Sequence, residues 1–495
     1  MLTEVDAASP AQASFRDPGG RLYRFPERIL RAVEPSHVDH LNQFLNTRTA
    51  QEATARGQLV RSTRVSAREL VELERDLALP ESEAGSLWLE HERIAFASFP
   101  YEWPPEMLHA AASLTLDLAE AALEEGFGLK DATPYNVLFR GAQAVFVDVL
   151  SFERRDPLDS TWLAYGQFVR TFLLPLAAQR YFGLPIDRVL SGQRDGIDPE
   201  TIYAWANWRR RLTPPLLGLV SIPKWLSGDK KETGLSYRSK RAGSAEQARF
   251  VLGGLLRSCR RQLKALAPKE HTESAWSGYL DHKSLYSPAQ LEQKERFVGQ
   301  ALDSLVHGMA RPARVLDIGA NEGRFSFLAA RRGAEVVAID SDPTVIGSIW
   351  RRTSAEKLAE NLNVLPLVVD FTRPTPAVGW RNQECPSFLD RVEKKFDMVM
   401  FLAVAHHILV TERIPLEDLL ALADELSRDF VLIEFVAPAD PMFQRIVRGR
   451  DELYSHFSPA WFEAAAMARF ELVRSERIDG LHRWLYLFRR RRATN

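Results

Sequence analysis

Three acidic residues stand at the ends of three successive apolar segments in the second half of the chain. Asp317 lies at the end of "ARVLDIG", Asp340 closes "AEVVAID", and Asp370 closes "NVLPLVVD". Because ligands bind beyond the carboxyl ends of parallel strands, these acids should gather at one edge of a sheet. Asp317 suits a cationic group and Asp340 suits two ribose hydroxyls. Asp370 suits an exocyclic amine, and the ring of Phe371 beside it can stack. Together they predict a site for a nucleoside with a charged tail.

The loop after the first of these segments, "LDIGANEG", carries two glycines. Gly319 and Gly323 allow a tight turn and let a ligand approach the backbone with no Cβ in the way. A dinucleotide-binding loop has the pattern G-x-G-x-x-G, which would put a glycine where Asp317 stands. An acid there would repel a pyrophosphate, but it suits an ammonium or sulfonium group.

This loop resembles the D-x-G-x-x-x-G motif of the class I S-adenosylmethionine-dependent methyltransferases. The resemblance implies that Asp317, Gly319 and Gly323 face the methionyl part of the cofactor, that Asp340 holds the ribose, and that Asp370 and Phe371 hold the adenine. We add two residues to the predicted cofactor site: Asn321 of the same loop, and Leu402, which follows the fourth strand. The alternative is a Rossmann-like domain that binds nothing.

A helix before the first strand commonly covers the cofactor in such folds. The segment "WSGYLDHKSLYSPAQLEQKERFV" precedes the sheet, so Tyr286 and Lys294 are predicted to meet the cofactor carboxylate.

The candidate catalytic residues follow the fourth and fifth strands. The segment 402–405, "LAVA", lacks the polar-Pro-Pro-aromatic motif of many N-methyltransferases, which favours a hydroxyl acceptor. His406 and His407 come next, and a neutral imidazole can take a proton near neutral pH. Glu434 ends the fifth strand and is predicted to orient a histidine or bind the acceptor. The alternatives are that the histidines cap a helix and that Glu434 is an ordinary strand-end acid.

The first half of the chain has its own constellation, in "GLKDATPYNVLFRGAQAVFVDVLSFE". Asp131 and Asn136 are spaced as in the catalytic loop of protein kinases and aminoglycoside phosphotransferases, and Asp148 follows on the next strand. The resemblance implies that Asp131 orients a hydroxyl, while Asn136 and Asp148 are a possible site for magnesium with ATP. The alternative is that these residues only brace the loop.

Several features of the kinase pattern are missing from this half. Leu129 and Lys130 replace the residues that usually precede the catalytic acid, and no glycine-rich loop lies near the first strands. No Lys–Glu pair that could hold phosphates is apparent, and Arg31 is the one basic residue at a strand position that suits this role. The activity of this region is therefore left open.

The predicted architecture is α/β. A class I methyltransferase domain, with a seven-stranded and mostly parallel sheet, follows an α+β kinase-like domain. We assign residues 1–20 to a flexible arm, 21–227 to the kinase-like domain, 228–275 to a basic linker with a helix near 245–266, and 276–495 to the methyltransferase domain.

Composition narrows the cellular setting of this 495-residue chain. Its net charge of −1 argues against a chain-wide nucleic-acid or membrane footprint. It has two cysteines, no signal-peptide pattern and no apolar run of about 18 residues, so we expect a cytoplasmic protein without a membrane span. The oligomeric state is not predictable from these features.

Several further segments resemble the bacterial family related to the NoeA-like nodulation protein. They are "YEWPPEML", "LKDATPYNVLF", "FVDVLSFE", "AHHILV", "RIPLEDLL" and "LIEFVAPADP". The resemblance spans roughly residues 20 to 490 and implies a methyltransferase behind a kinase-like region. The leading hypothesis is an O-directed methyltransferase acting on a glycan or small metabolite, with the kinase-like domain positioning the acceptor. The alternatives are a bifunctional kinase–methyltransferase and a non-catalytic cofactor-binding scaffold.

Overall fold

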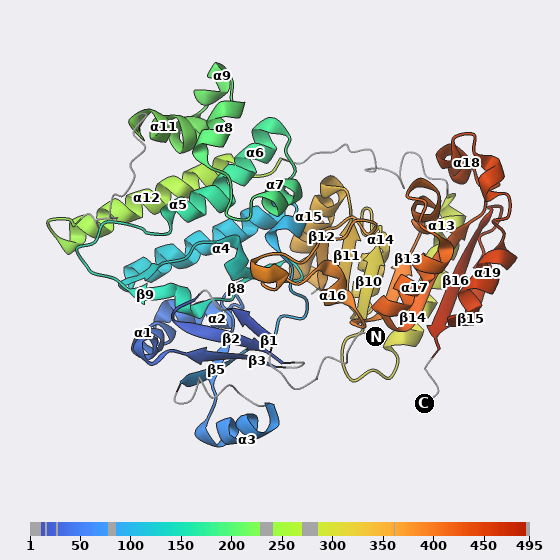
Figure 1. Cartoon of the computed structure of the whole chain (residues 1–495), viewed down its shortest axis with the longest axis horizontal. Coiled ribbons are helices and arrows are strands. Elements are labelled where there is room, and N and C mark those ends of the chain that lie inside the picture. Colours follow the sequence, from blue (N-terminus) through green and yellow to red (C-terminus); the bar gives the residue numbers. More distant parts are fainter. Residues whose placement is uncertain are drawn as a thin grey trace. The chain divides into compact units, whose positions relative to one another are not determined.

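The chain forms two compact units, which we describe separately. The computed structural model describes residues 11–14, 17–25, 28–77, 86–227, 241–269, 286–360 and 362–491 (Figure 1). Unit 1 consists of Met1–Tyr101, Pro105–Pro268 and Gly379–Glu384; unit 2 consists of Glu102–Pro104, Lys269–Val378 and Cys385–Asn495. The predicted domain boundaries stay a prediction, because residues 228–240 and 270–285 lie outside the described part.

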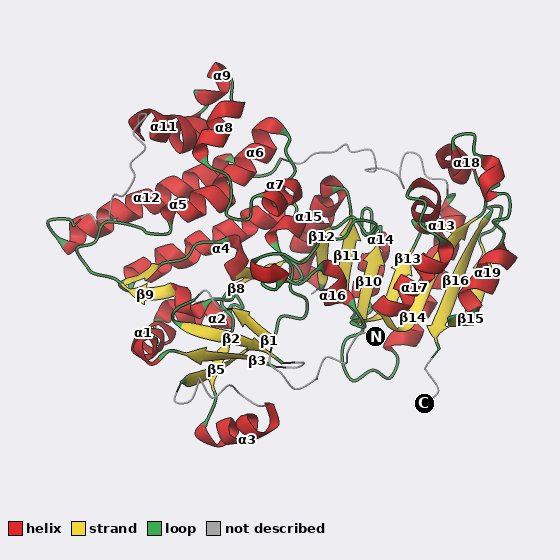
Figure 2. Ribbon diagram, in the orientation of Figure 1, coloured by secondary structure: helices red, strands yellow, loops and turns green. Residues whose placement is uncertain are grey.

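Unit 1 begins with a five-stranded antiparallel sheet in the order β1-β2-β3-β5-β4 (Figure 2). Its strands are β1 (Ala11–Ser14), β2 (Gly20–Arg24), β3 (Ile29–Val33), β4 (Ser62–Arg64) and β5 (Leu87–His91). The segment "SLWLEHERIAFASF", residues 86–99, has the pattern of a strand pair, but β5 is the one strand formed there. In β3 the register places Arg31 opposite Leu89 of β5.

The centre of unit 1 is α4 (Pro105–Glu124), which begins after Pro104 and stops before Gly126, where φ is +83°. Prolines at a helix start and a glycine past its end are the expected signals. Next come β6 (Phe127–Leu129), which pairs with β9 (Phe152–Arg154), and the hairpin of β7 (Val137–Arg140) and β8 (Gln143–Phe146). Asp131 and Asn136 lie between β6 and β7, and Asp148 follows β8, as the motif requires.

The other helices of unit 1 are α1 (Pro35–Leu45), α2 (Arg48–Ala55), α3 (Ala67–Leu77), α5 (Tyr165–Phe168), α6 (Leu174–Phe182), α7 (Ile186–Gly192), α8 (Pro199–Trp205), α9 (Trp208–Arg211), α10 (Pro214–Leu216), α11 (Ile222–Ser227) and α12 (Ala245–Ala265). Of these helices, α2, α6 and α12 pack on α4. The segment that we assigned to a linker helix is α12, and it packs on α4, where Arg260 binds Asp117 and Glu120.

Unit 2 contains a seven-stranded sheet in the order β12-β11-β10-β13-β14-β16-β15. The strands are β10 (Arg314–Ile318), β11 (Glu335–Asp340), β12 (Val364–Val368), β13 (Phe396–Phe401), β14 (Ser427–Val436), β15 (Phe470–Arg477) and β16 (Arg483–Arg490). Strands β10 to β14 are parallel, and β16 is antiparallel to both of its neighbours. The predicted seven-stranded, mostly parallel sheet is therefore confirmed.

Helices cover this sheet and explain why its strands are nearly continuous apolar runs. They are α13 (Pro288–Val306), α14 (Arg324–Ala330), α15 (Pro343–Glu360), α16 (Phe388–Val392), α17 (Leu416–Leu426), α18 (Pro441–Val447) and α19 (Pro459–Met467). α14 and α15 pack on β11 and β12, α17 packs on β13 and β14, and α19 packs on β15. No helix among the described residues is both long and apolar enough to cross a membrane.

Candidate functional site

A cavity of about 280 Å³ opens at the carboxyl ends of the parallel strands of unit 2. Its wall includes all three predicted strand-end acids, Asp317, Asp340 and Asp370. Three separate segments of the sequence thus meet at one site, because parallel strands end on the same edge. Gly319, Asn321, Phe371 and Leu402, also predicted for the cofactor, line the same cavity.

The loop after β10 needs its glycines for conformation and for space. Gly319 has a φ of +71°, and a Cβ there would lie 2.9 Å from the Cβ of Val404. Gly323 has a φ of +77°, and its Cβ would lie 3.0 Å from Ile349. Asn321, between them, has a φ of +48°, which asparagine tolerates better than most residues. The backbone at this loop therefore comes close to the cavity without a side chain at position 319.

Asp317 is almost completely buried at the end of β10. Its Oδ2 accepts a hydrogen bond of 2.6 Å from the hydroxyl of Ser326. Burial raises the pKa of Asp317 to about 6, although Ser326 and Lys294 favour the charged form. A buried acid with a raised pKa gains from a cationic ligand.

Asp340, at the end of β11, is fixed by backbone donors. Its Oδ2 accepts from the amide of Asn321 at 3.0 Å, and its Oδ1 accepts from the amide of Asp342 at 3.0 Å. Each carboxylate oxygen has a second lone pair, so the group still has capacity for two ligand hydroxyls. Burial raises the pKa of Asp340. The side-chain Oδ1 of Asn321 is buried and has no partner among the described residues, so it offers a further acceptor.

Asp370 and Phe371 follow β12 and form another part of the wall. Asp370 accepts from the amide and hydroxyl of Thr372 at 2.9 and 2.6 Å and from Arg373 at 3.1 Å. The carboxylate of Asp370 is thus engaged mainly with its own loop. Phe371 is held edge-on against Phe401, with ring centroids 5.4 Å apart, which fixes its ring in the wall.

The two histidines after β13 have different positions. His407 lines the cavity, whereas His406 is 1% exposed and lies behind it, with the ring centroids 4.3 Å apart. Burial lowers the pKa of His407, and the charge of Arg483 adds to this effect. Burial also lowers the pKa of His406 well below its ordinary value. Both rings are therefore neutral at pH 7, and His407 is the one placed to meet a ligand.

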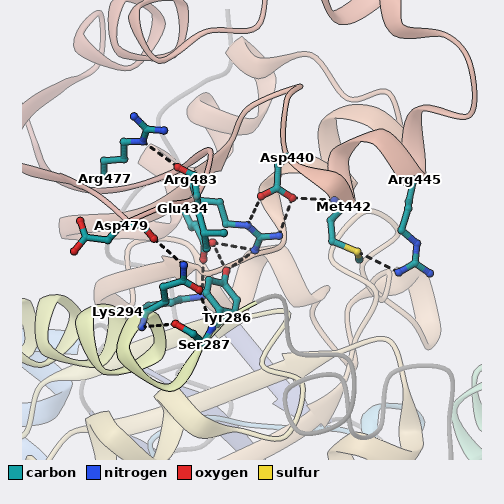
Figure 3. Close-up of polar contacts among 12 residues, drawn as sticks. Tyr286, Ser287, Lys294, Glu434, Asp440, Met442, Arg445, Arg477, Asp479 and Arg483 are labelled. Carbon is teal, nitrogen blue, oxygen red and sulfur yellow. Dashed lines mark hydrogen bonds and ion pairs between the residues drawn. The ribbon is translucent and has the colours of Figure 1, made fainter.

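Glu434 belongs to a buried charged cluster rather than to the cavity wall (Figure 3). Its Oε2 lies 2.5 Å from the Nζ of Lys294, and its Oε1 lies 3.3 Å from Arg483 and accepts from the hydroxyl of Tyr286. Arg483 also binds both oxygens of Asp440, at 2.8 and 3.0 Å. Burial would raise the pKa of Glu434, but Lys294 and Arg483 outweigh it and lower that pKa.

This cluster contains two residues that the sequence analysis did not find. Arg483 starts the apolar strand β16 and is fully buried, and Asp440 caps α18. Arg483 stands directly before the apolar segment "WLYLF", and this was the feature of the sequence that could have indicated a buried charge. Tyr286 and Lys294 line the cavity, and both are also bound to Glu434. The cluster is charge-balanced, so Glu434 is not placed to act as a free base.

In unit 1 the kinase-like residues lie together, but their carboxylate is already occupied. Asp148 Oδ1 binds Arg31 at 2.8 Å, and Asp148 Oδ2 accepts from the hydroxyl of Ser151 at 2.5 Å. The amide of Asn136 donates to Ser151 Oγ and to the carbonyl of Asp131, both at 3.2 Å. Burial opposes ionisation of Asp148, but Arg31 outweighs it and lowers the pKa.

These contacts do not fit the magnesium ion that the kinase resemblance implies. The guanidinium of Arg31 stands against the oxygen that would bind the metal, and Asn136 turns donor hydrogens toward Ser151. Within the described residues, no group of three or more His, Cys, Asp or Glu side chains is arranged to hold a metal. The possible Mg-ATP site at Asn136 and Asp148 is thus not supported, because the guanidinium of Arg31 already provides the positive charge beside Asp148.

Unit 2 is a mixed α/β domain with a seven-stranded sheet and a cavity at the carboxyl ends of its parallel strands. No protein-family model matches the chain. Nodulation protein NoeA of Rhizobium meliloti (strain 1021) is 27% identical over 498 aligned positions, which cover 99% of this chain and 98% of that protein. This match confirms the resemblance to the NoeA-like proteins that the sequence motifs indicated.

Two solved structures give partial matches. The bifunctional kinase-methyltransferase WbdD is 18% identical with a TM-score of 0.32, over 45% of this chain and 44% of that one. The N-methyltransferase NodS of Bradyrhizobium japonicum is 13% identical with a TM-score of 0.30, over 42% of this chain and 99% of that one. At such TM-scores, neither match bears on the activity of this chain.

Proposed function

We propose that the chain is an S-adenosylmethionine-dependent methyltransferase that methylates an oxygen atom. The observation that carries the proposal is the convergence of Asp317, Asp340 and the glycine loop at Gly319 on one cavity. Asp317 is buried with a raised pKa, so its carboxylate favours a cationic ligand. Asp340 presents two oxygens to a diol. These are the features that a ligand with a ribose and a positively charged tail requires.

Each residue has a separate task in binding. Asp340 and Asn321 would hold the ribose, and Phe371 would pack on the adenine beside Asp370. Asp317, with Gly319 giving close access, would attract the charged methionyl part, and Lys294 and Tyr286 would lie near its carboxylate. When bound, S-adenosylmethionine supplies an electrophilic methyl group.

His407 is the proposed general base. Its ring lines the cavity and is neutral at pH 7, because burial lowers its pKa. A ring nitrogen of His407 would take up the proton of the acceptor hydroxyl while the methyl group passes to the acceptor oxygen; the C–S bond of the sulfonium would break, and its electron pair would stay on sulfur as a neutral thioether. We assign His406 to packing behind His407, and Glu434 to fixing Lys294 and Tyr286 at the cavity wall.

The acceptor class that we propose is a hydroxylated molecule, such as a glycan or a small metabolite. The basis is the sequence "LAVA" before the histidines, which offers no polar side chains to hold an amine. We propose that unit 1 positions this acceptor without phosphorylating it. The bound state of Asp148 supports that choice over the bifunctional kinase–methyltransferase.

The proposal is tested by incubating the protein with methyl-labelled S-adenosylmethionine and bacterial polysaccharide or metabolite extracts. We expect label in a product that is stable to base treatment, as an ether is. Calorimetry with S-adenosylhomocysteine gives an independent reading of cofactor binding. Binding without transfer to any extract would favour the non-catalytic scaffold, and no binding at all would overturn the proposal.

A further inference from the structure

Unit 1 carries a group of short helices whose outer side chains are unusually apolar. We call residues 201–226 the tryptophan cluster; it includes most of α8, all of α9 and α10, and most of α11. Figure 1 shows α8, α9 and α11 close to one another at one edge of this unit, and the helices contact each other through the segment 217–221. The cluster is remote in sequence from every residue assigned to the two sites above.

Exposure of large apolar side chains is concentrated in this cluster. Six of the fourteen such side chains exposed among the described residues belong to these 26 positions. Their exposed fractions run from 42% to 82%: Trp205, Trp208, Leu212, Ile222, Trp225 and Leu226. Single exposed apolar residues are ordinary, but a concentration of this kind marks an interaction surface.

Three of the four aromatic rings of the cluster have polar partners, and the fourth, Trp205, lies edge-on to the ring of Phe182. The indole of Trp225 donates to the hydroxyl of Tyr203 at 3.2 Å, and the guanidinium of Arg211 lies 3.8 Å from the centre of the Tyr203 ring. The guanidinium of Arg209 lies 5.2 Å from the ring of Trp208. Fixed rings beside cations lose little freedom when they enter an interface.

Charge indicates the kind of partner. The cluster contains four basic residues and no acid, which gives it a charge of +4 in a chain whose net charge is −1: Arg209, Arg210, Arg211 and Lys224. Arg209 and Arg210 are exposed. Tryptophan with arginine or lysine is the composition of protein surfaces that lie at the boundary between lipid headgroups and acyl chains.

We infer that the tryptophan cluster binds the surface of an anionic phospholipid bilayer. The indoles would lie at headgroup level, Leu212, Ile222 and Leu226 would reach the outer acyl region, and the arginines would meet lipid phosphates. A second copy of the chain would place +4 against +4, which opposes self-association. A nucleic acid would leave the three aliphatic side chains without a partner. This inference is independent of the proposed methyltransferase activity.

The test uses the full chain and large vesicles, sedimented in low and high salt. One vesicle population is phosphatidylcholine alone, and the other contains about one third phosphatidylglycerol. We expect binding to the anionic vesicles that falls as salt rises, since exposed charges are screened. Each of Arg209→Gln and Arg210→Gln should weaken it by roughly fivefold.

The variant Trp208→Ala/Leu226→Ala removes two strongly exposed side chains and should weaken vesicle binding at least tenfold without lowering the melting temperature. A matched control is Trp380→Ala/Leu453→Ala, because both of those side chains are 62% exposed and lie outside the cluster. Three results would overturn the inference: no sedimentation with either vesicle, equal loss in the control variant, or a dimer that Trp208→Ala/Leu226→Ala dissociates.

Discussion

The acids of unit 2 and those of unit 1 stand at or just beyond the ends of strands, but their charges are compensated in different ways. Asp317 and Asp340 are buried in a cavity wall, and burial raises the pKa of each. Asp148 is also enclosed, but its pKa is lowered because Arg31 lies 2.8 Å away. The charge of Asp317 is therefore not fully compensated within the fold, whereas Arg31 compensates the charge of Asp148.

This difference shows that two sites can both contain acidic motifs although a bound cation would stabilise the acids of only one of them. A buried carboxylate is costly unless a cation or donors compensate it. In unit 2 a bound cation would lower that cost, so ligand binding is favoured. In unit 1 the ion pair with Arg31 lowers the cost within the fold, and the same acids then stabilise structure.

The largest effect that we expect is on the chemistry of unit 2. His407→Ala should lower the rate of methyl transfer by about 10²–10⁴, the usual contribution of general-base assistance. Cofactor affinity should change little, because His407 is assigned to the acceptor side. His406→Ala serves as the matched control and should cost much less. Single-turnover kinetics with labelled cofactor measure both, and full activity of the His407 variant would exclude it as the base.

The second prediction concerns Arg31. Arg31→Met should lower the free energy of unfolding of unit 1 by about 3 kcal/mol, because breaking an enclosed ion pair leaves Asp148 uncompensated. The double variant with Asp148→Asn should recover part of that loss. Arg48→Met, at an exposed pair with Glu52, should cost well under about 1 kcal/mol. Urea unfolding of the wild type, Arg31→Met, Asp148→Asn, their double variant and Arg48→Met gives the free energies; additive losses in the double variant would argue against the pair.

The third prediction contrasts acids across the units. Asp340→Ala should weaken binding of S-adenosylmethionine by about 1.5–3 kcal/mol, the cost of losing charge-assisted hydrogen bonds. Asp148→Asn should leave that affinity unchanged. Isothermal calorimetry compares the two variants directly. Equal affinity of wild type and Asp340→Ala would remove Asp340 from the cofactor site.

The fourth prediction follows from the pKa of about 6 at Asp317. Above pH 6 the carboxylate is charged, and cofactor affinity should be constant. As the pH falls through 6, Asp317 takes up a proton and affinity for the cationic cofactor should fall, up to about tenfold per pH unit. In Asp317→Asn the affinity should be weak at every pH. Calorimetry between pH 5 and 8 checks this, and an identical pH profile in the variant would refute it.

The smallest expected effect is an absence of response in unit 1. Mg-ATP at millimolar concentration should leave the melting temperature of the wild type unchanged, since a ligand stabilises only the state that binds it. Asp148→Asn should keep methyl transfer within a few-fold of the wild type. A shift of several degrees that disappears in Asp148→Asn would instead indicate an active kinase site.

The sequence was sufficient to predict the parallel strands, the acids at their ends and the glycine loop. Apolar segments each followed by an acid predicted the parallel strands, and the order of those strands brings Asp317, Asp340 and Asp370 to one cavity. The glycine loop was predictable for the same reason, because positive φ at Gly319 is a local requirement.

Pairings between distant segments could not be read from the sequence. Arg31 and Asp148 are 117 positions apart, and Tyr286 and Arg483 are 197 apart. The segments "ILRAV" and "RWLYLF" do not indicate which residues Arg31 and Arg483 will contact, because those contacts depend on how strands and helices pack. Likewise, two adjacent histidines in the sequence gave no reason to prefer one of them, whereas the structure shows that His407 lines the cavity and His406 does not.

The contact between Gly319 and Val404 also has a consequence for inheritance. The loop that would receive the cofactor and the loop that carries the histidines touch where position 319 has only a hydrogen atom, 2.9 Å from the place of Val404 Cβ if a Cβ were added. With the backbone in its present position, a Cβ at 319 is too close to Val404, so any other residue there would force one of the two loops to move. A descendant of this chain that keeps both loops in these positions must therefore keep glycine at 319.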